Sequence, residues 1–367
     1  VALGAGRVGA DDGKAKKRKQ AAARNASDGK TRGEPTNAPS AVAREAAKES
    51  IVRLSAEGLA RVVDESINNR IIQEKVSAAP LAGDAEFLRR VSLDITGVIP
   101  TSEKAAEFVD NKDPAMRAKL IDELLESSDF GRHLADIWQD LLTDRDSTNR
   151  LLTVEPLVDW LADGFNSDKS WDKMVTELLT ATGTQEQNGA ATFFISNRTP
   201  DKLNDKVCQL FLGVSLQCAQ CHNHPFTGYK RTEYWGMAAF FSKVRAGGKK
   251  VGKGPPEVVN EDGRGRGLPL PESALEVPPK FLGAEEPKLD SKEPYRPALA
   301  HWLTSDENPY FAKAMVNRMW AQLFGRGLVN PIENIDSNNP PSHPELFDAL
   351  TQQFAANGFD LKFLVRS

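Results

Sequence analysis

Large apolar residues recur every three or four positions through most of residues 41–245, the spacing produced by one face of an α-helix. The pattern is clear in the stripe Phe130, Leu134, Ile137, Trp138 and Leu141. Similar stripes predict further helices over residues 51–67, 116–125, 154–165, 171–182 and 203–211. Alternating patterns typical of strands are absent from this region, so we expect it to be mostly helical.

A second group of helices is predicted after residue 293. Asn308 and the proline that follows it should cap a helix over residues 311–324, and Gly325 is placed to end that helix in the left-handed conformation. Ser342 and Glu345 have the spacing of a capping box, in which each side chain bonds the other residue's backbone. They predict the start of another helix.

The two helical groups are separated by a segment of different composition. Residues 246–292 are rich in Gly, Pro, Lys and Glu, which predicts a linker or loop-rich insert. Within it, Glu257-Val258-Val259 and Leu268 predict a small β-hairpin. The expected fold is therefore mostly α: two helical units joined by a Gly/Pro-rich linker. Their predicted bounds are residues 41–245 and 293–367, with the second domain truncated at Ser367.

The first forty residues have the composition of a disordered tail. Residues 11–40 carry no large apolar side chain, so they cannot bury enough surface to offset the entropy of ordering. Residues 1–10 are small and apolar before an acidic pair, which is typical either of the end of a signal sequence or of a disordered tail. The first interpretation predicts an exported protein, in the periplasm or at the cell surface.

Charge and hydropathy exclude two classes of protein. The formal net charge is only −4, which does not predict a nucleic-acid partner. No apolar run approaches the roughly 20 residues of a membrane-spanning helix, so we expect no membrane span in this fragment. Nucleotide-binding loops, GxSxG and HExxH are also absent, so no hydrolase, kinase or metalloprotease motif indicates an enzyme.

The sharpest chemical signal is the motif Cys218-x-x-Cys221-His222. Haem c is attached through two cysteine thioethers, and the histidine that follows them can bind the iron. The two-residue spacer sets the reach of the sulfurs to the two vinyl groups on the ring. The motif predicts Cys218 and Cys221 as anchors and His222 as the proximal ligand.

Three alternatives to haem remain open for the same residues. The cysteines could form a local disulfide or dithiol in an oxidising compartment. His222 and His224 could bind a metal ion such as zinc together with the thiolates, although four ligands within seven residues is a tight spacing for zinc. The third alternative is purely structural, with the cysteines acting as small buried apolar residues.

Other residues are candidates for a haem pocket. Trp235 and Phe240 follow the motif and are candidate pocket walls. The sixth iron ligand is left open by the sequence, and its candidates are His133, His224, Met237, His301, Met315, Met319 and His343.

Several long strings carry a family resemblance. Residues 87–97 (FLRRVSLDITG) and 211–226 (FLGVSLQCAQCHNHPF) resemble the large planctomycete cytochrome-c-like domain family, whose function is uncharacterised. Residues 317–328 (NRMWAQLFGRGL) and 339–345 (NPPSHPE) resemble the partner domain, of unknown function, that typically follows it.

The resemblance implies an exported protein with tandem domains and haem attached at the CxxCH motif. We therefore expect a c-type haem protein acting in electron transfer or redox sensing, with a redox partner protein that the sequence does not identify. The alternative is a non-catalytic surface or polysaccharide-binding scaffold protein, in which CxxCHxH is a disulfide clip or metal site.

Overall fold

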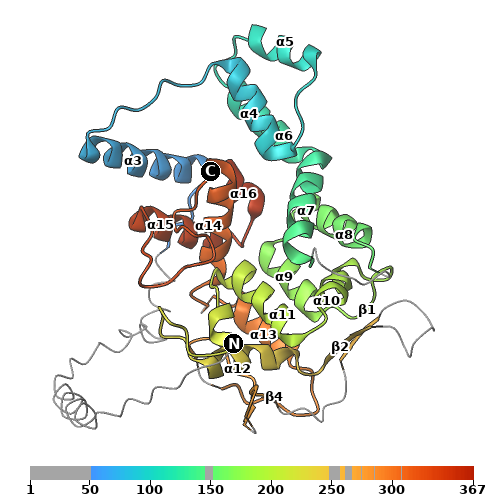
Figure 1. The fold of residues 1–367 in the computed structure, drawn as a ribbon. Coiled ribbons are helices and arrows are strands. Elements are labelled where there is room, and N and C mark those ends of the chain that lie inside the picture. The colour runs from blue at the N-terminus through green and yellow to red at the C-terminus, as the bar shows by residue number, and fades with distance from the viewer. Residues whose placement is uncertain are drawn as a thin grey trace, which may run out of the picture. The chain divides into compact units, whose positions relative to one another are not determined.

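Helices make up most of the regular secondary structure in the described chain, which confirms the expected mostly α fold (Figure 1). The computed structural model describes residues 51–144, 152–247, 257–260, 267–273, 275–284, 286–306 and 308–367. The tail predicted for residues 1–40, with its signal-sequence interpretation, lies outside these ranges. In the part of the chain that is described, no helix combines the length and the apolar character needed to span a membrane.

The helices are joined by connections of very different lengths, the longest of which runs from η4 to α13. The α-helices are α3 (Ala56–Glu74), α4 (Asp84–Thr96), α5 (Ser102–Asp110), α6 (Met116–Glu126), α7 (Ser128–Leu142), α8 (Glu155–Asn166), α9 (Trp171–Thr180), α10 (Thr192–Asn197), α11 (Pro200–Val207), α12 (Arg231–Ala238), α13 (Arg296–Thr304), α14 (Phe311–Phe324), α15 (Pro344–Ala356) and α16 (Leu361–Arg366). Shorter helical turns are η1 (Gly189–Ala191), the π-helical η2 (Cys208–Leu212), and the 3₁₀-helices η3 (Gln217–Gln220) and η4 (Ala239–Phe241).

Local capping explains several helix ends. The hydroxyl of Ser55 accepts a hydrogen bond from the Gly58 N–H, so α3 begins at Ala56 rather than at the apolar residues before it. The Asn308 carboxamide accepts from the Phe311 N–H at 3.1 Å, and Gly325 ends α14 at φ +75°, both as predicted. The capping box predicted for the next helix is wrong.

That helix, α15, begins at Pro344 after His343, and no side chain caps it. Proline needs no partner for a backbone N–H and already has helical φ, so it starts the helix without a capping box. The Ser342 hydroxyl contacts the ring of His343 at 3.1 Å instead.

Strands are few in the described chain and lie in two small sheets. In the first, β1 (Gly183–Thr184), β3 (Glu257–Asn260) and β2 (Val244–Gly247) are antiparallel in the order β1-β3-β2. In the second, β4 (Leu268–Pro269) pairs with β5 (Glu276–Val277). The predicted pairing of residues 257–259 with Leu268 is therefore wrong, because β3 pairs with two strands that precede it and buries Val258 completely.

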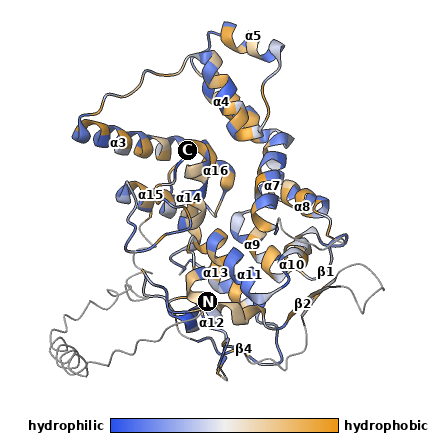
Figure 2. Cartoon of the chain, in the orientation of Figure 1, coloured by the Kyte–Doolittle hydropathy of each residue, from blue (hydrophilic) through white to orange (hydrophobic). Residues whose placement is uncertain are grey.

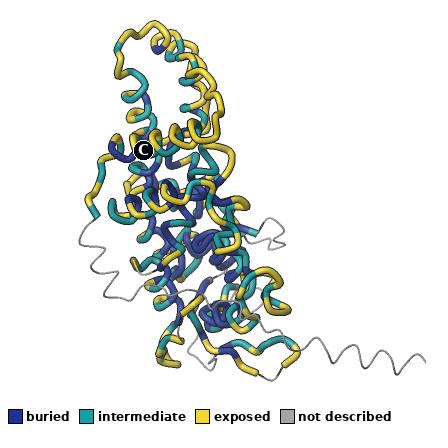
Figure 3. Tube along the Cα trace, turned by 90° about the vertical axis from the view of Figure 1, so that its left-hand side faces the viewer, coloured by how far each residue is buried: buried dark blue, intermediate teal, exposed yellow. Residues whose placement is uncertain are grey.

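A large apolar core runs through most helices of Val52–Ser367, which form a compact unit, and a smaller cluster of Leu88, Phe108 and Leu120 lies among α4, α5 and α6. Figure 2 shows apolar and polar residues on the same helices, and Figure 3 shows buried segments flanked by exposed ones. At its centre the ring of Trp138 lies 4.5 Å from that of Trp171 and 6.3 Å from that of Phe211. The core continues into α13 and α14, where Leu299 and Phe311 are buried. Helices from both family-like regions thus share apolar contacts.

A buried arginine fastens α13 to the end of α9. Arg296 is 1% exposed, and its Nη1 donates to the carbonyls of Leu179 and Ala181 at 2.9 and 2.8 Å. These carbonyls have no partner within α9, because the last turn of a helix leaves its C=O groups free. Burial lowers the pKa of Arg296 to about 10, so the guanidinium stays charged at neutral pH.

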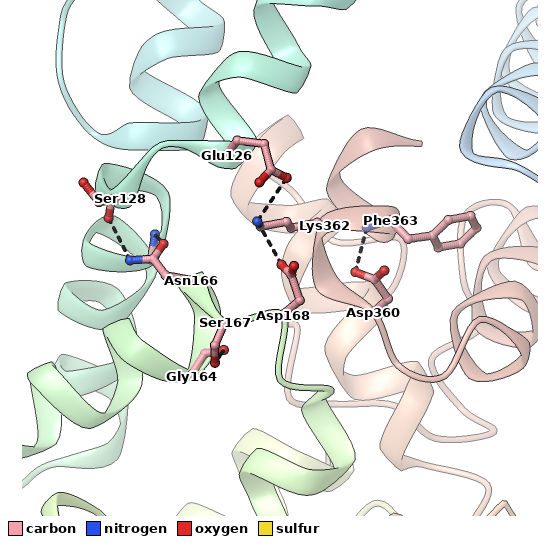
Figure 4. A network of polar contacts seen from close by, with 10 residues as sticks. Glu126, Ser128, Gly164, Asn166, Ser167, Asp168, Asp360, Lys362 and Phe363 are labelled. Atoms are coloured by element: carbon pink, nitrogen blue, oxygen red, sulfur yellow. Dashed lines mark hydrogen bonds and ion pairs between the residues drawn. The ribbon is translucent and has the colours of Figure 1, made fainter.

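The last helix is attached by ion pairs. The Lys362 Nζ lies 3.2 Å from Glu126 and 2.8 Å from Asp168, which join α16 to α6 and to the turn after α8 (Figure 4). Burial lowers the pKa of Lys362, but its bonds to Asp168 and Glu126 outweigh that effect and raise it. The Trp171 N–H also donates to the Phe359 carbonyl at 3.1 Å.

Candidate functional site

The CxxCH motif lies on a loop that begins at a glycine turn. The π-helical segment η2 ends at Gly213, whose φ of +65° is readily adopted by glycine. A side chain there would also collide with Ile335, because its Cβ would lie 2.5 Å from the Ile335 Cδ1. The chain then passes the buried residues Val214 and Leu216 and enters the short helix η3.

Within the short helix η3 and the residue after it, one side chain of the motif points into the core and the two cysteines lie at the surface. Ala219 is completely buried, whereas Cys218 and Cys221 are exposed and free. Two thiols three positions apart are therefore presented outside the core on one anchored loop. They remain accessible to a reaction partner.

The third cysteine has a different environment. Cys208 is completely buried, and its thiol donates to the Asn204 Oδ1 at 3.4 Å. Burial raises the pKa of Cys208 because the thiolate would lose its hydration, with a smaller contribution from the charge of Asp205. This cysteine is a core residue rather than a reactive one.

Two side chains of α12 hold the motif loop through one carbonyl. The Gln220 carbonyl accepts from the Trp235 Nε1 at 3.0 Å and from the Arg231 Nε at 3.3 Å. The Arg231 N–H donates to the Asn223 Oδ1 at 3.0 Å, and its Nη2 donates to the Pro271 carbonyl at 2.8 Å. No local sequence pattern indicated these hydrogen bonds, because each donor residue is eight to forty positions from its acceptor residue.

His222 is exposed and has one ring nitrogen occupied. Its Nδ1 lies 2.7 Å from the Asn223 carbonyl, a group that only accepts, so Nδ1 carries the proton. In the neutral ring this leaves a lone pair on Nε2, the arrangement commonly found in metal-binding histidines. His222 is thus prepared to bind a metal through Nε2.

His224 has the opposite tautomer. Its Nδ1 accepts from the backbone N–H groups of Phe226 and Thr227 at 3.3 and 3.1 Å, so the neutral ring carries its proton on Nε2. The ring closes a turn and has no lone pair to offer a metal. Within the described ranges, no group of three or more His, Cys, Asp and Glu residues is placed to hold a metal ion.

The two predicted pocket walls have different surroundings. Trp235 is half-buried beside the motif through its bond to Gln220. Phe240 is completely buried, and its ring stacks on Phe281 at 4.9 Å, which in turn stacks on Trp302 at 4.9 Å. Trp235 therefore lies beside the motif, whereas Phe240 presents no exposed face to it.

Most candidates for a sixth ligand are placed in the core or away from the motif loop. Met237, Met315 and Met319 are all buried, which is the packing expected of methionine on an apolar stripe. His133 lies on α7, where burial lowers its pKa below the usual value, partly opposed by Asp136 and Asp94. His343 contacts Ser342 before α15.

A half-buried carboxyl on α11, that of Asp205, was not predicted from the sequence. The Tyr234 hydroxyl donates to the Asp205 Oδ1 at 3.0 Å. Burial raises the pKa of Asp205 to about 6, against the lowering effect of the Tyr234 hydrogen bond. Tyr234 is the neighbour of Trp235, so the same turn of α12 contacts both this carboxyl and the motif loop.

The motif loop also contacts the second family-like region. The Asn338 Nδ2 donates to the Phe226 carbonyl at 3.0 Å, and the Ile335 N–H donates to the Gly213 carbonyl at 2.9 Å. The side chain of Phe226 itself is 82% exposed. It places apolar surface next to the motif.

Fold and site together define a mostly helical protein with an exposed, internally anchored CxxCH loop. Residues 62–246 match a family model described as PSCyt2, protein of unknown function (DUF1549). Residues 295–367 match a second model, PSD1, protein of unknown function (DUF1553), in the order predicted for a first domain and its partner. Because the first match covers half of the chain, this protein belongs to the PSCyt2 (DUF1549) family. No curated protein and no solved structure matches it.

Proposed function

We propose that the chain carries haem c, attached through Cys218 and Cys221, with the His222 Nε2 as the proximal iron ligand. The observation that supports this most is the protonation of the His222 ring. Its Nδ1–H bond to the Asn223 carbonyl leaves Nε2 free, directly after two exposed free thiols.

The surrounding residues fit such a group. Ala219 in the core and the Gln220 carbonyl, held by Trp235 and Arg231, fix the backbone between the two thiols. The exposed ring of Phe226 offers apolar surface beside the motif. When bound, haem would supply one-electron redox chemistry, and these residues would hold and orient it.

The proposal extends to location and role. Covalent haem attachment of this kind is made on exported chains, so the protein would lie in the periplasm or at the cell surface. It would act in electron transfer or redox sensing, as the resemblance to planctomycete cytochrome-c-like domains suggests. A protein redox partner would then dock near the motif loop.

The test is co-expression with a cytochrome c maturation system, followed by intact mass and a pyridine haemochrome spectrum. The expected result is the mass of one haem and its spectrum, both lost in Cys218→Ser/Cys221→Ser. Cys208→Ala removes the buried thiol instead and should keep the haem. An unmodified mass, with a known cytochrome matured in the same cells, would overturn the proposal.

A second candidate is the disulfide clip of a non-catalytic surface or polysaccharide-binding scaffold. It is favoured by the hydrogen bonds that already close the loop, including the two backbone bonds to His224. If the cysteines form such a clip, their oxidation should lower the mass by that of two hydrogen atoms, and no haem should be attached. Thiol titration before and after reduction, with metal analysis of the same sample, separates it from a metal site involving the thiolates and His222.

A further inference from the structure

A groove of about 440 Å³ opens at the end of α14, and none of its lining residues is one assigned to the haem. This volume lies within the range of about 300–1,000 Å³ typical of small-molecule sites. The groove is lined by aromatic, cationic and amide side chains, among them Trp320, Phe324, Arg326, Asn330, Asn339 and His343.

Two aromatic rings form its apolar side. Trp320 and Phe324 lie one helical turn apart, with centroids at 4.4 Å and planes tilted by 38°. Phe324 is 62% exposed, although it ends a helix whose other large apolar residues are mostly buried. A ring kept at the surface in this way offers an apolar face to a ligand.

The polar side of the groove has an excess of positive charge. Arg326 is exposed and has no ion-pair partner within the residues that the structure describes. No Asp or Glu lines the groove among those residues. A planar guanidinium in these surroundings suits a carboxylate, which it can bind with two parallel hydrogen bonds.

The amide of Asn339 is already oriented. Its Nδ2 donates to the carbonyls of Asn334 and Asn330 at 3.0 and 3.4 Å, which leaves its Oδ1 as an acceptor. Such an amide can bind a hydroxyl of a ligand at a defined position.

The loop that carries Arg326 and Asn330 is also fixed in place. The buried Asn317 donates to the Val329 carbonyl and accepts from the Val329 N–H, both at 2.9 Å. Gly327 lies so close that an added Cβ would come within 2.4 Å of the Val329 oxygen. The groove is therefore preorganised, which lowers the cost of binding.

We infer that this groove binds an acidic saccharide, with a uronate carboxylate on Arg326 and a sugar face against Phe324 and Trp320. A pyranose presents C–H groups on one face and hydroxyls at its edge, which matches an aromatic pair opposite fixed amides. The inference gives the second candidate function a site and a ligand class, and it does not depend on haem.

The test is isothermal titration of the full chain with trigalacturonate at low ionic strength, with neutral maltotriose for comparison. Trigalacturonate should bind and maltotriose should bind at least tenfold more weakly. Arg326→Gln and Phe324→Ala should each weaken trigalacturonate binding by about tenfold, the loss expected for one charge-assisted or stacking contact. Both residues are exposed, so the variants should fold, which circular dichroism would verify.

Two matched controls separate the site from general charge and from the motif. Arg90→Gln removes an exposed arginine on α4 and should leave binding unchanged. Cys218→Ser/Cys221→Ser should also bind normally, so loss of haem and loss of sugar binding are distinguishable. No binding of trigalacturonate, equal binding of maltotriose, or equal binding by Arg326→Gln would each overturn the inference.

Discussion

The indole Nε1 of Trp235 donates a hydrogen bond of 3.0 Å to the carbonyl of Gln220, one of the two residues between the motif cysteines. This single contact connects a helix of the core to the backbone that presents the thiols. It lies beside the bond from Arg231, which uses the same acceptor at 3.3 Å. The backbone of the motif is thus held by side chains that lie 11 and 15 residues after Gln220 in the sequence.

Removing the indole donor should loosen the motif loop. Trp235→Phe keeps an aromatic ring but loses the bond to Gln220, so the free energy of unfolding should fall by about 1 kcal/mol. In protein made without haem, alkylation of Cys218 and Cys221 should become faster, as measured by mass spectrometry over time. The control Trp302→Phe alters a ring stack with Phe281 and should leave the alkylation rate unchanged. Equal rates in Trp235→Phe and the wild type would contradict the anchoring role.

Arg296 should be one of the most sensitive positions of the fold. Arg296→Ala would leave the carbonyls of Leu179 and Ala181 without this donor in the core and open a cavity. We expect a loss of about 3 kcal/mol or more in urea denaturation. Arg326→Ala, at an exposed arginine, should change stability by less than about 0.5 kcal/mol. Similar losses in the two variants would show that the buried bonds contribute little.

The half-buried carboxyl of Asp205 should make stability depend on pH. Its pKa is raised to about 6 in the folded state, above the value of about 3.9 usual for an unfolded chain. Between these values the folded state binds more protons than the unfolded state, so this group's contribution to stability falls as the pH rises. Asp205→Asn keeps an acceptor for Tyr234 and removes the titration.

The gain in stability of Asp205→Asn over the wild type should therefore be larger at pH 7.5 than at pH 4. Urea denaturation of both proteins at the two pH values measures this difference. Asp129→Asn, at an exposed acid of α7, is measured alongside as the matched substitution. A gain that is independent of pH would contradict the raised pKa.

The ion pairs of Lys362 should contribute modestly and in a salt-dependent way. Its side chain is 15% exposed, so Lys362→Gln should lower stability by about 1 kcal/mol and speed hydrogen exchange in α16. The loss should shrink at high salt, because screening weakens the pairs in the wild type. Lys119→Gln, whose side chain is 70% exposed, should have a smaller effect. A loss unaffected by salt would indicate packing rather than charge.

Local patterns were sufficient to predict many helices. Residues 154–165 and 171–182 were expected to be helical, and α8 and α9 occupy Glu155–Asn166 and Trp171–Thr180. Their apolar stripes have helical spacing, and this signal is contained in a short stretch of chain. The capping box at Ser342 failed because Pro344 starts α15 without it.

Strand pairing could not be predicted in the same way. The sequence suggested that residues 257–259 pair with Leu268, but β3 lies between β1 and β2 and buries Val258. The pairing of strands depends on which strand edges come together once the helices have packed. A stretch of four residues does not carry that information.

By itself, the sequence determined the helical class of this protein and the positions of Cys218, Cys221 and His222, because both are properties of neighbouring residues. Only the tertiary structure decided that the two thiols face outward around a buried Ala219 and that the His222 Nε2 is left free. It alone placed Arg296 on the end of α9 and gathered the groove at Phe324. Apart from the contact between the neighbours His222 and Asn223, these features arise from contacts between distant segments, whose geometry is fixed when the core packs.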